Sequence, residues 1–142
     1  MKVKIKVMKG GRIPEFKHSD DACADCYARI GCGETIIPKG ARMLIPLGFA
    51  IELEKGWEAI IRPRSGLSSN GIEVSLGTID AGFRGEVKAC LVNNSGAELT
   101  VLDGERICQL AVREAPEIEF EVSQELSDTE RGENGFGSTG IK

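Results

Sequence analysis

The glycine-rich run near the carboxyl end of the chain carries the clearest chemistry. It reads Arg131-Gly132-Glu133-Asn134-Gly135-Phe136-Gly137-Ser138-Thr139-Gly140. So many glycines make a helix or strand unfavourable, because glycine loses much backbone entropy on ordering. Arg131 can bind a phosphate, Ser138 and Thr139 can donate hydroxyls, and Phe136 offers a face for a base. The run therefore indicates a nucleotide-binding tail, although most Gly/Ser-rich ends are simply solvated.

A second glycine-flanked segment places a carboxylate close to an aromatic ring. It reads Gly77-Thr78-Ile79-Asp80-Ala81-Gly82-Phe83-Arg84-Gly85-Glu86. This pattern predicts a hairpin whose backbone can approach a flat ligand. Asp80 is expected at the rim of the hairpin, placed to accept a proton from water. A lone aspartate before a glycine is more often a turn former, but Phe83, three residues later, favours a site.

Three further segments supply polar groups. Arg64 and Ser65 stand at the start of a predicted short helix, where free N–H groups and the helix dipole favour a phosphate. An ordinary helix cap is the simple alternative. Gln109 lies between apolar neighbours and is a candidate polar group of a site. The simple alternative is an exposed polar residue on an edge strand. Asp25 interrupts a mainly apolar strand, so it is paired or functional. A role near Mg²⁺, which takes oxygen ligands, suits it.

Five cysteines are present, an odd number in a chain without an export signal. A reduced, cytoplasmic setting fits this count best. Cys23 and Cys26 form a CxxC motif, and His18 and Cys32 offer the remaining ligands of an alternative zinc site. If Cys23–Arg29 is extended, however, the two sulfurs point to opposite faces. Small buried apolar side chains are therefore the favoured interpretation for most of the cysteines.

The bulk properties limit the class of protein. The chain has 142 residues, enough for one domain with one core. Its net charge of −4 argues against gripping a nucleic-acid backbone as the main task. No apolar stretch approaches the roughly 20 residues that span a bilayer. Met1–Val7 alternates charged and apolar residues, which predicts a strand and not a signal peptide. We therefore expect neither membrane nor nucleic-acid partners.

Short apolar segments separated by Gly, Pro, Asn and Asp predict an all-β sandwich or barrel. Most of them alternate with period two or are rich in β-branched residues. One short helix is expected over Ser65–Asn70. The predicted strands are Lys2–Val7, Ala41–Ile45, Gly48–Leu53, Glu58–Arg62, Glu86–Asn93, Leu99–Leu102, Ile107–Val112 and Ile118–Val122.

The last of these strands suggests assembly. Pro116 lacks an N–H group and keeps the preceding residue extended, so the chain leaves its sheet there. Ile118–Val122 can then pair within its own chain or add to the sheet edge of a neighbour. The pattern fits both alternatives equally. We expect residues 1–122 to form one β domain that includes this strand, and residues 123–142 to form an arm.

Together and in this order, the motifs resemble the trimeric dUTPase family over nearly the whole chain, from about Ala22 to Gly140. The segments that carry the resemblance are Pro63–Leu67, Gly77–Glu86, Gly104–Leu110 and Arg131–Gly140. The resemblance implies a jelly-roll-like homotrimer that exchanges its C-terminal strand and arm. Each of three active sites would combine residues of three chains. The activity implied is hydrolysis of dUTP to dUMP and pyrophosphate.

The resemblance also implies a role for each matching residue. Asp80 would activate the water that attacks the α-phosphorus. Mg²⁺ would be held mainly by the triphosphate, and Asp25 would reach it through water. The other expected substrate contacts are Gly77, Thr78 and Ile79 around uracil, Phe83 under the deoxyribose, Arg64, Ser65, Gly66 and Gln109 near the phosphates, Arg131, Ser138 and Thr139 on the γ-phosphate, Phe136 stacked on uracil, and Gly137 and Lys88. The tail would then be a lid that substrate orders.

Three residues depart from the family pattern. Phe83 stands where tyrosine is usual, so whatever the phenolic oxygen contributes to excluding UTP is lost. Cys26 stands where leucine is usual and fills a core less fully. Asn134 stands where glycine is common and tolerates a left-handed backbone.

Two other functions share these features. A dCTP deaminase has the same fold but needs a glutamate at the position of Cys90, in the stretch Lys88–Asn93. Without that carboxylate the deamination lacks its general acid and base. The other alternative is a dUTP-sensing module that binds a regulatory protein, as some phage relatives are reported to do. It stays open as a second role.

Overall fold

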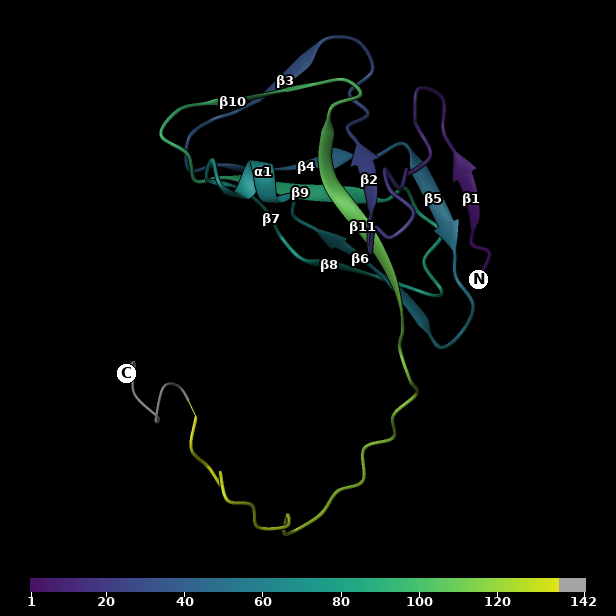
Figure 1. The fold of residues 1–142 in the computed structure, drawn as a ribbon, viewed down its shortest axis with the longest axis vertical. Coiled ribbons are helices and arrows are strands. Elements are labelled where there is room, and N and C mark those ends of the chain that lie inside the picture. Colours follow the sequence, from purple (N-terminus) through teal and green to yellow (C-terminus); the bar gives the residue numbers. More distant parts are fainter. Residues whose placement is uncertain (136–142) are drawn as a thin grey trace.

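The chain is built almost entirely of β-strands. The computed structural model describes residues 1–135 (Figure 1). They form one short helix, α1 (Ser65–Ser68), and the strands β1 (Lys4–Val7), β2 (Ala24–Tyr27), β3 (Glu34–Ile37), β4 (Arg42–Pro46), β5 (Phe49–Glu52), β6 (Trp57–Arg62), β7 (Ile72–Val74), β8 (Gly77–Asp80), β9 (Lys88–Asn93), β10 (Leu99–Leu102) and β11 (Arg106–Glu114). The predicted all-β class is confirmed, and the helix is two residues shorter than expected.

The strands form four small antiparallel sheets around one core. One has the order β2-β11-β6-β8 and a second the order β4-β9-β7, while β1 pairs with β5 and β10 with β3. Across residues 1–135 these sheets do not close into a barrel. Side chains such as Phe49, Ile61 and Leu91 are fully buried between them. Each contributes roughly 1.5–3 kcal/mol by leaving water, so the core fixes the sheets that carry the polar residues.

Two strands, β3 and β7, were not predicted from the sequence. Both are short, and each pairs with a strand that was predicted. Glu34–Ile37 pairs with β10 and Ile72–Val74 pairs with β9. Segments of three or four residues hold too few alternations to be recognised by periodicity. Seven of the eight predicted strands are present with modest shifts of their ends.

The register of the four-stranded sheet places the predicted polar residues. Gln109 of β11 lies opposite Asp25 of β2 on one side and opposite Arg62 of β6 on the other. At the other end of β6, Glu58 lies opposite Asp80 of β8. The four residue steps from Glu58 to Arg62 span roughly 13 Å, and the three strand spacings from β8 to β2 span about 14 Å. Asp80 and Asp25 therefore occupy opposite corners of this sheet.

The predicted hairpin around Asp80 is closed only at its base. There β7 pairs with β9, and the Ser75 N–H donates to the Cys90 carbonyl at 2.9 Å. From Gly77 onward the first arm leaves β9 and pairs with β6 instead. The prediction of a simple hairpin over Gly77–Glu86 is thus wrong in its pairing, because the two arms belong to different sheets. This divergence opens a space between them.

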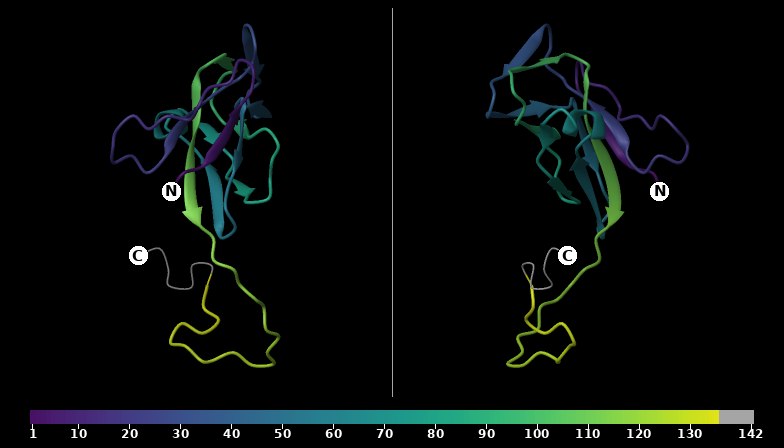
Figure 2. Two further views of the ribbon diagram at one scale, coloured as in Figure 1. Left: turned by 90° about the vertical axis from the view of Figure 1, so that its right-hand side faces the viewer. Right: turned by 60° about the vertical axis from the view of Figure 1, so that its left-hand side comes forward.

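Beyond β11 the chain runs away from the β domain (Figures 1 and 2). The last contacts are a hydrogen bond from the Ala115 N–H to the Gly56 carbonyl and an ion pair between Lys55 and Glu117. Ile118–Val122 forms no strand, and Phe120 is 87% exposed. Pairing of this segment within its own chain, one of the two alternatives, is therefore wrong. The alternation is a real strand pattern, but the chain directs it away from every sheet edge of its own domain.

Candidate functional site

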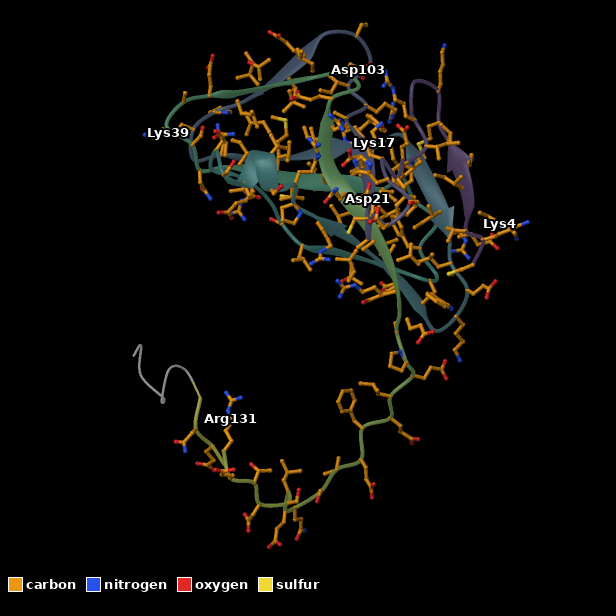
Figure 3. The ribbon with its side chains drawn as sticks, in the orientation of Figure 1. Lys4, Lys17, Asp21, Lys39, Asp103 and Arg131 are labelled. Carbon is orange, nitrogen blue, oxygen red and sulfur yellow. The ribbon has the colours of Figure 1, made fainter. Side chains whose placement is uncertain are left out.

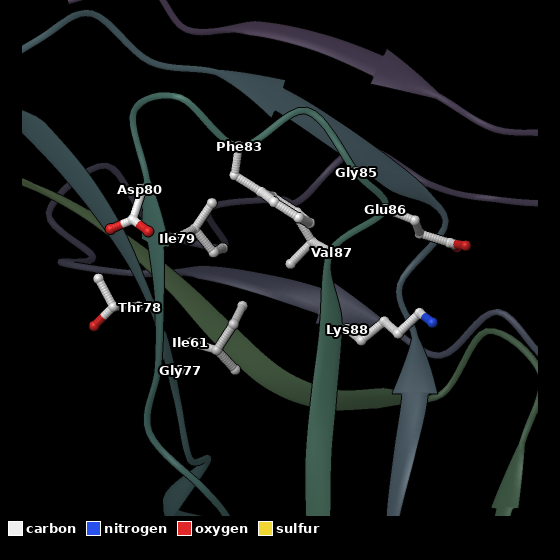
Figure 4. A pocket seen from close by; sticks show the side chains of 10 residues that line it. All are labelled: Ile61, Gly77, Thr78, Ile79, Asp80, Phe83, Gly85, Glu86, Val87 and Lys88. Carbon is white, nitrogen blue, oxygen red and sulfur yellow. The ribbon is translucent and has the colours of Figure 1, made fainter.

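A cavity of about 520 Å³ lies where the two arms of the hairpin diverge. The side chains of Ile61, Ile79 and Val87 and the ring of Phe83 converge on it (Figure 4). β8 is the last strand of its sheet, so one edge of its backbone is paired with β6 and the other faces this cavity. The cavity thus offers apolar walls together with backbone donors and acceptors, which suits a small planar heterocycle.

All six residues predicted on this segment line the cavity, namely Gly77, Thr78, Ile79, Asp80, Phe83 and Lys88. Ile79 is buried, whereas Asp80 is exposed and projects at the rim. The Phe83 N–H donates to the Asp80 carbonyl at 3.0 Å, which closes the turn between them. An exposed carboxylate beside a mostly apolar cavity can hold and deprotonate a water molecule. Four lining residues were not predicted as site residues, because their place in the cavity depends on the separation of the arms: Ile61, Gly85, Glu86 and Val87.

A second cluster surrounds the buried carboxylate of Asp25. Its Oδ1 accepts hydrogen bonds from Arg64 Nε at 3.2 Å and from Gln109 Nε2 at 3.1 Å, and its Oδ2 accepts one from Arg106 Nη1 at 3.0 Å. Asp25 is only 4% exposed. Two guanidinium groups and an amide therefore compensate its charge and are themselves held in place. The structure brings together Asp25, Arg64 and Gln109, three residues that the sequence singled out separately.

Arg106 is the member of this cluster that the sequence did not single out. Arg106 and Gln109 are three residues apart on β11, and in a regular strand such residues point to opposite faces. The pairing of β11 with β2 shifts register between Arg106 and Cys108, which brings both side chains to Asp25. The only sequence feature that could have pointed to Arg106 is its place in the Gly104-Glu105-Arg106 motif.

The segment Arg64–Gly66 borders the same cluster. Arg64 is the cap of α1 but makes no capping bond with its side chain. Its guanidinium bonds to Asp25 and, through Nη1, to the Arg106 carbonyl at 3.0 Å. The simple interpretation as a capped helix with solvated arginines is therefore wrong for Arg64. Ser65 and Gly66 are exposed beside it.

The cysteines divide between core and surface. Cys26 and Cys108 are buried opposite each other on β2 and β11, Cys23 and Cys90 are half-buried, and Cys32 is exposed. The favoured interpretation of buried apolar side chains thus holds for two of the five. A hydrogen bond with Cys108, together with burial, raises the pKa of the Cys26 thiol. Cys26 thus packs in the core beside Cys108, and the zinc alternative at the CxxC motif finds no support in the described residues.

Arg131, at the start of the predicted tail, lies apart from both clusters. Arg131 is exposed on the segment that leaves the domain (Figure 3), and its Nε donates to the Asn134 carbonyl at 2.9 Å. Phe136, Gly137, Ser138 and Thr139 lie outside the described residues. No helix within residues 1–135 is long and apolar enough to cross a membrane.

Removing the Asp25 carboxylate tests how far this cluster supports the fold. Asp25→Ala leaves two guanidinium groups and an amide without their partner, and we expect the free energy of unfolding to fall by roughly 3–5 kcal/mol. The measurement is urea denaturation at one fixed protein concentration. Asp20→Ala, which removes an exposed aspartate from the loop before β2, is the matched control. A loss no larger than that of the control would show that the cluster does not stabilise the fold.

Known proteins resemble this chain over its full length. A model of the dUTPase family matches residues 9–140. The deoxyuridine 5'-triphosphate nucleotidohydrolase of Gloeothece citriformis is 41% identical over 145 residues, which cover 99% of this chain and 98% of that protein. The protein of the same name from Clostridium tetani is 39% identical over 142 residues, covering 97% and 96% of the two chains.

Solved structures agree with this assignment. The dUTPase of Staphylococcus bacteriophage 80alpha, determined with dUPNHPP, superimposes with a TM-score of 0.91 at 25% identity and covers 99% of both chains. A dUTPase from phage phi11 of S. aureus superimposes with a TM-score of 0.83 at 17% identity, covering 91% of this chain and all of that one, and shares the fold. The all-β architecture is thus that of known dUTPases. The chain belongs to the dUTPase family.

Proposed function

We propose that this protein hydrolyses dUTP to dUMP and pyrophosphate, with each active site assembled from neighbouring copies of the chain. The cavity between β8 and β9, with Asp80 at its rim, is the observation that carries the proposal. It offers apolar walls and an unpaired backbone edge for a pyrimidine, and a carboxylate where the phosphate chain would leave. The dUTPase relatives support the same substrate.

The cavity explains how uracil is selected. In this proposal the walls of Ile61, Ile79 and Val87 lie against the base and would crowd the methyl group of thymine. The free edge of β8 carries backbone groups whose donor and acceptor order is fixed, and cytosine presents the opposite pattern. A site built on such hydrogen bonds rejects a mismatched analogue strongly, because its own polar groups are left unpaired. The ring of Phe83 packs against the deoxyribose and crowds a 2′-hydroxyl.

Asp80 acts as general base. It accepts a proton from water while the water oxygen attacks the α-phosphorus in line. The bond from that phosphorus to the bridging oxygen breaks, and pyrophosphate leaves with the electron pair. Arg64, Ser65, Gly66 and Gln109 bind the phosphates and hold this geometry, which is where most of the rate enhancement in phosphoryl transfer arises.

Mg²⁺ fits this scheme when it is held by the substrate. The Oδ1 of Asp25 already accepts two hydrogen bonds and the Oδ2 accepts one, and two guanidinium groups adjoin them. This arrangement opposes direct binding of a cation but leaves Oδ2 able to accept a bond from a metal-bound water. No cluster of three or more His, Cys, Asp or Glu suited to a metal occurs in residues 1–135. Bound Mg²⁺ would neutralise charge on the triphosphate.

The separation of the two polar regions supports the proposal that each site combines more than one chain. Asp80 and the Asp25 cluster sit at opposite corners of one sheet, so one substrate cannot contact both within a single chain. We therefore assign the cavity to one copy and the Arg64–Gln109 region to a second copy. The arm of a third copy, with Arg131, Phe136, Gly137, Ser138 and Thr139, closes over the nucleotide.

The assembly uses the segment that leaves its own domain. Ile118, Phe120 and Val122 alternate with glutamates, and all three apolar side chains are exposed. β1 has the complementary pattern, with lysines between Val3, Ile5 and Val7, and pairs with β5 along only one edge. Val3 and Ile5 also line an apolar groove of about 440 Å³, with Trp57 and Leu110. We assign this groove and edge to the Ile118–Val122 segment of another copy.

Replacing the proposed base tests the chemistry. We expect the unaltered protein to release pyrophosphate from dUTP, and far less from UTP, dTTP or dCTP. In Asp80→Asn, kcat for dUTP should fall about 10³-fold, while binding of dUpNHpp is retained. Glu58→Gln, which removes the carboxylate opposite Asp80, is the matched control and keeps activity. Unchanged turnover in Asp80→Asn would show that Asp80 is not the general base. Ammonia release from dCTP at a rate comparable to dUTP turnover would favour the deaminase.

Deleting residues 131–142 tests the arm. The deleted protein should remain assembled, because Ile118–Val122 is intact, yet lose nearly all turnover of dUTP, because the γ-phosphate and the base lose their cover. Light scattering and pyrophosphate release measure the two properties separately. Loss of assembly would mean that the arm is structural.

One substitution in the exposed segment tests the assembly. Phe120→Asp places a charge in the apolar groove, so we expect the trimer to dissociate at micromolar protein concentrations. Leu126→Asp changes an equally exposed side chain beyond the alternating segment and should leave the trimer intact. Size-exclusion chromatography with light scattering measures both. A Phe120→Asp protein that stays fully trimeric would contradict the strand exchange.

A further inference from the structure

An ion pair at the border of the cavity, between Arg29 and the lining residue Glu86, connects two segments that are far apart in sequence. Arg29 follows β2 and Glu86 precedes β9, 57 residues later. Arg29 Nε donates to Glu86 Oε1 and Arg29 Nη2 donates to Glu86 Oε2, both at 2.8 Å. The side chains are 29% and 17% exposed, respectively. Two parallel hydrogen bonds from one planar group fix orientation as well as distance, so this pair holds the backbone at Glu86 firmly.

The turn between β4 and β5 completes the attachment. The Gly48 N–H donates to Glu86 Oε1 at 3.0 Å, and Val87 exchanges backbone hydrogen bonds with Leu47 and Phe49 at 3.0 and 2.8 Å. Gly48 has a φ of +76°, and a Cβ there would lie 2.8 Å from Arg29 Cδ. Arg29 therefore packs directly on Gly48, and any residue with a side chain at this position would clash with it.

Gly85 and Phe83 connect the anchored backbone at Glu86 to the cavity. A Cβ on Gly85 would lie 2.5 Å from Phe83 Cζ, so the ring rests directly against the backbone of Gly85. Phe83 is 44% exposed and thus has little other packing to hold it. In Figure 4 the Phe83 ring points into the cavity, whereas the Glu86 carboxylate points away from it. Glu86 lines the cavity, but its carboxylate is held by Arg29 and the Gly48 N–H, so it acts on the nucleotide mainly through the position of Gly85 and the ring.

We propose that Arg29 and Glu86 are positioning residues that hold the Phe83 ring in place against the sugar and so set the discrimination between dUTP and UTP. The inference rests on the proposed function. It matters more in this chain than in relatives with tyrosine, because Phe83 has no hydroxyl that could anchor the ring by a hydrogen bond. The Arg29–Glu86 pair supplies that constraint from the other side of the loop.

The expected kinetic effect separates positioning from catalysis. Asp80 lies on β8, whose position is fixed by pairing with β6 and not by the Arg29–Glu86 pair. Loss of the pair should therefore leave kcat within about threefold of the unaltered protein. The looser ring should raise KM for dUTP about tenfold and lower the ratio of kcat/KM for dUTP to that for UTP about tenfold.

The test compares four variants with the unaltered trimer. Arg29→Met and Glu86→Gln remove the pair, Arg29→Lys keeps the charge but loses the parallel bonds, and Arg42→Met removes an exposed arginine on β4 as the matched control. We measure kcat and KM for dUTP and UTP below each variant's melting temperature. The first two variants should show the tenfold changes, Arg29→Lys an intermediate change, and Arg42→Met none.

Two outcomes would overturn the proposal, and they are distinguishable. If the unaltered protein turns over dUTP, and Arg29→Met and Glu86→Gln lower the melting temperature but keep its KM and its selectivity, the pair is only structural. If the unaltered protein releases no pyrophosphate from dUTP, the proposed function fails, and the role in selectivity fails with it.

Discussion

The register of β6 is the constraint on which the site depends. One end of this strand carries Arg62, opposite Gln109, which bonds to Asp25, and the other carries Glu58, opposite Asp80. A slip of one residue in either ladder would turn every side chain of the slipped strand to the wrong face. The buried residues Ala59 and Ile61 prevent such a slip, because they would be forced into water. The same packing that forms the core thus fixes the distance between the two polar regions.

The two regions also differ in how they are held. The cavity is built from backbone and apolar side chains, and its shape comes from the divergence of two arms that belong to different sheets. The Asp25 cluster is built from charges that compensate one another. Apolar walls beside a free strand edge suit recognition of a base by shape and by backbone hydrogen bonds. A cluster rich in guanidinium groups suits a triphosphate, whose negative charge it can meet with little rearrangement.

Much of this arrangement could be predicted from the sequence, because the motifs are local. The residues Gly77–Asp80 lie in one strand, and their place in a single pocket follows from their spacing. What could not be predicted depends on contacts between distant residues or on irregular pairing. Arg106 reaches Asp25 only because β11 shifts register before Cys108. Arg29 and Glu86 meet only after the whole domain has folded. Ile118–Val122 has a strand pattern, but a pattern does not reveal whose sheet it joins.

The lysines of β1 have a consequence for the newly made chain. An unpaired, apolar strand edge is a template for uncontrolled aggregation, and positive side chains at alternate positions are a common means of discouraging it. Lys2, Lys4 and Lys6 flank Val3, Ile5 and Val7 in this way. They repel another copy of β1 but attract an acidic strand. The lysines thereby disfavour self-association of newly synthesised monomers through the strand edge that we assign to the Ile118–Val122 segment of another copy.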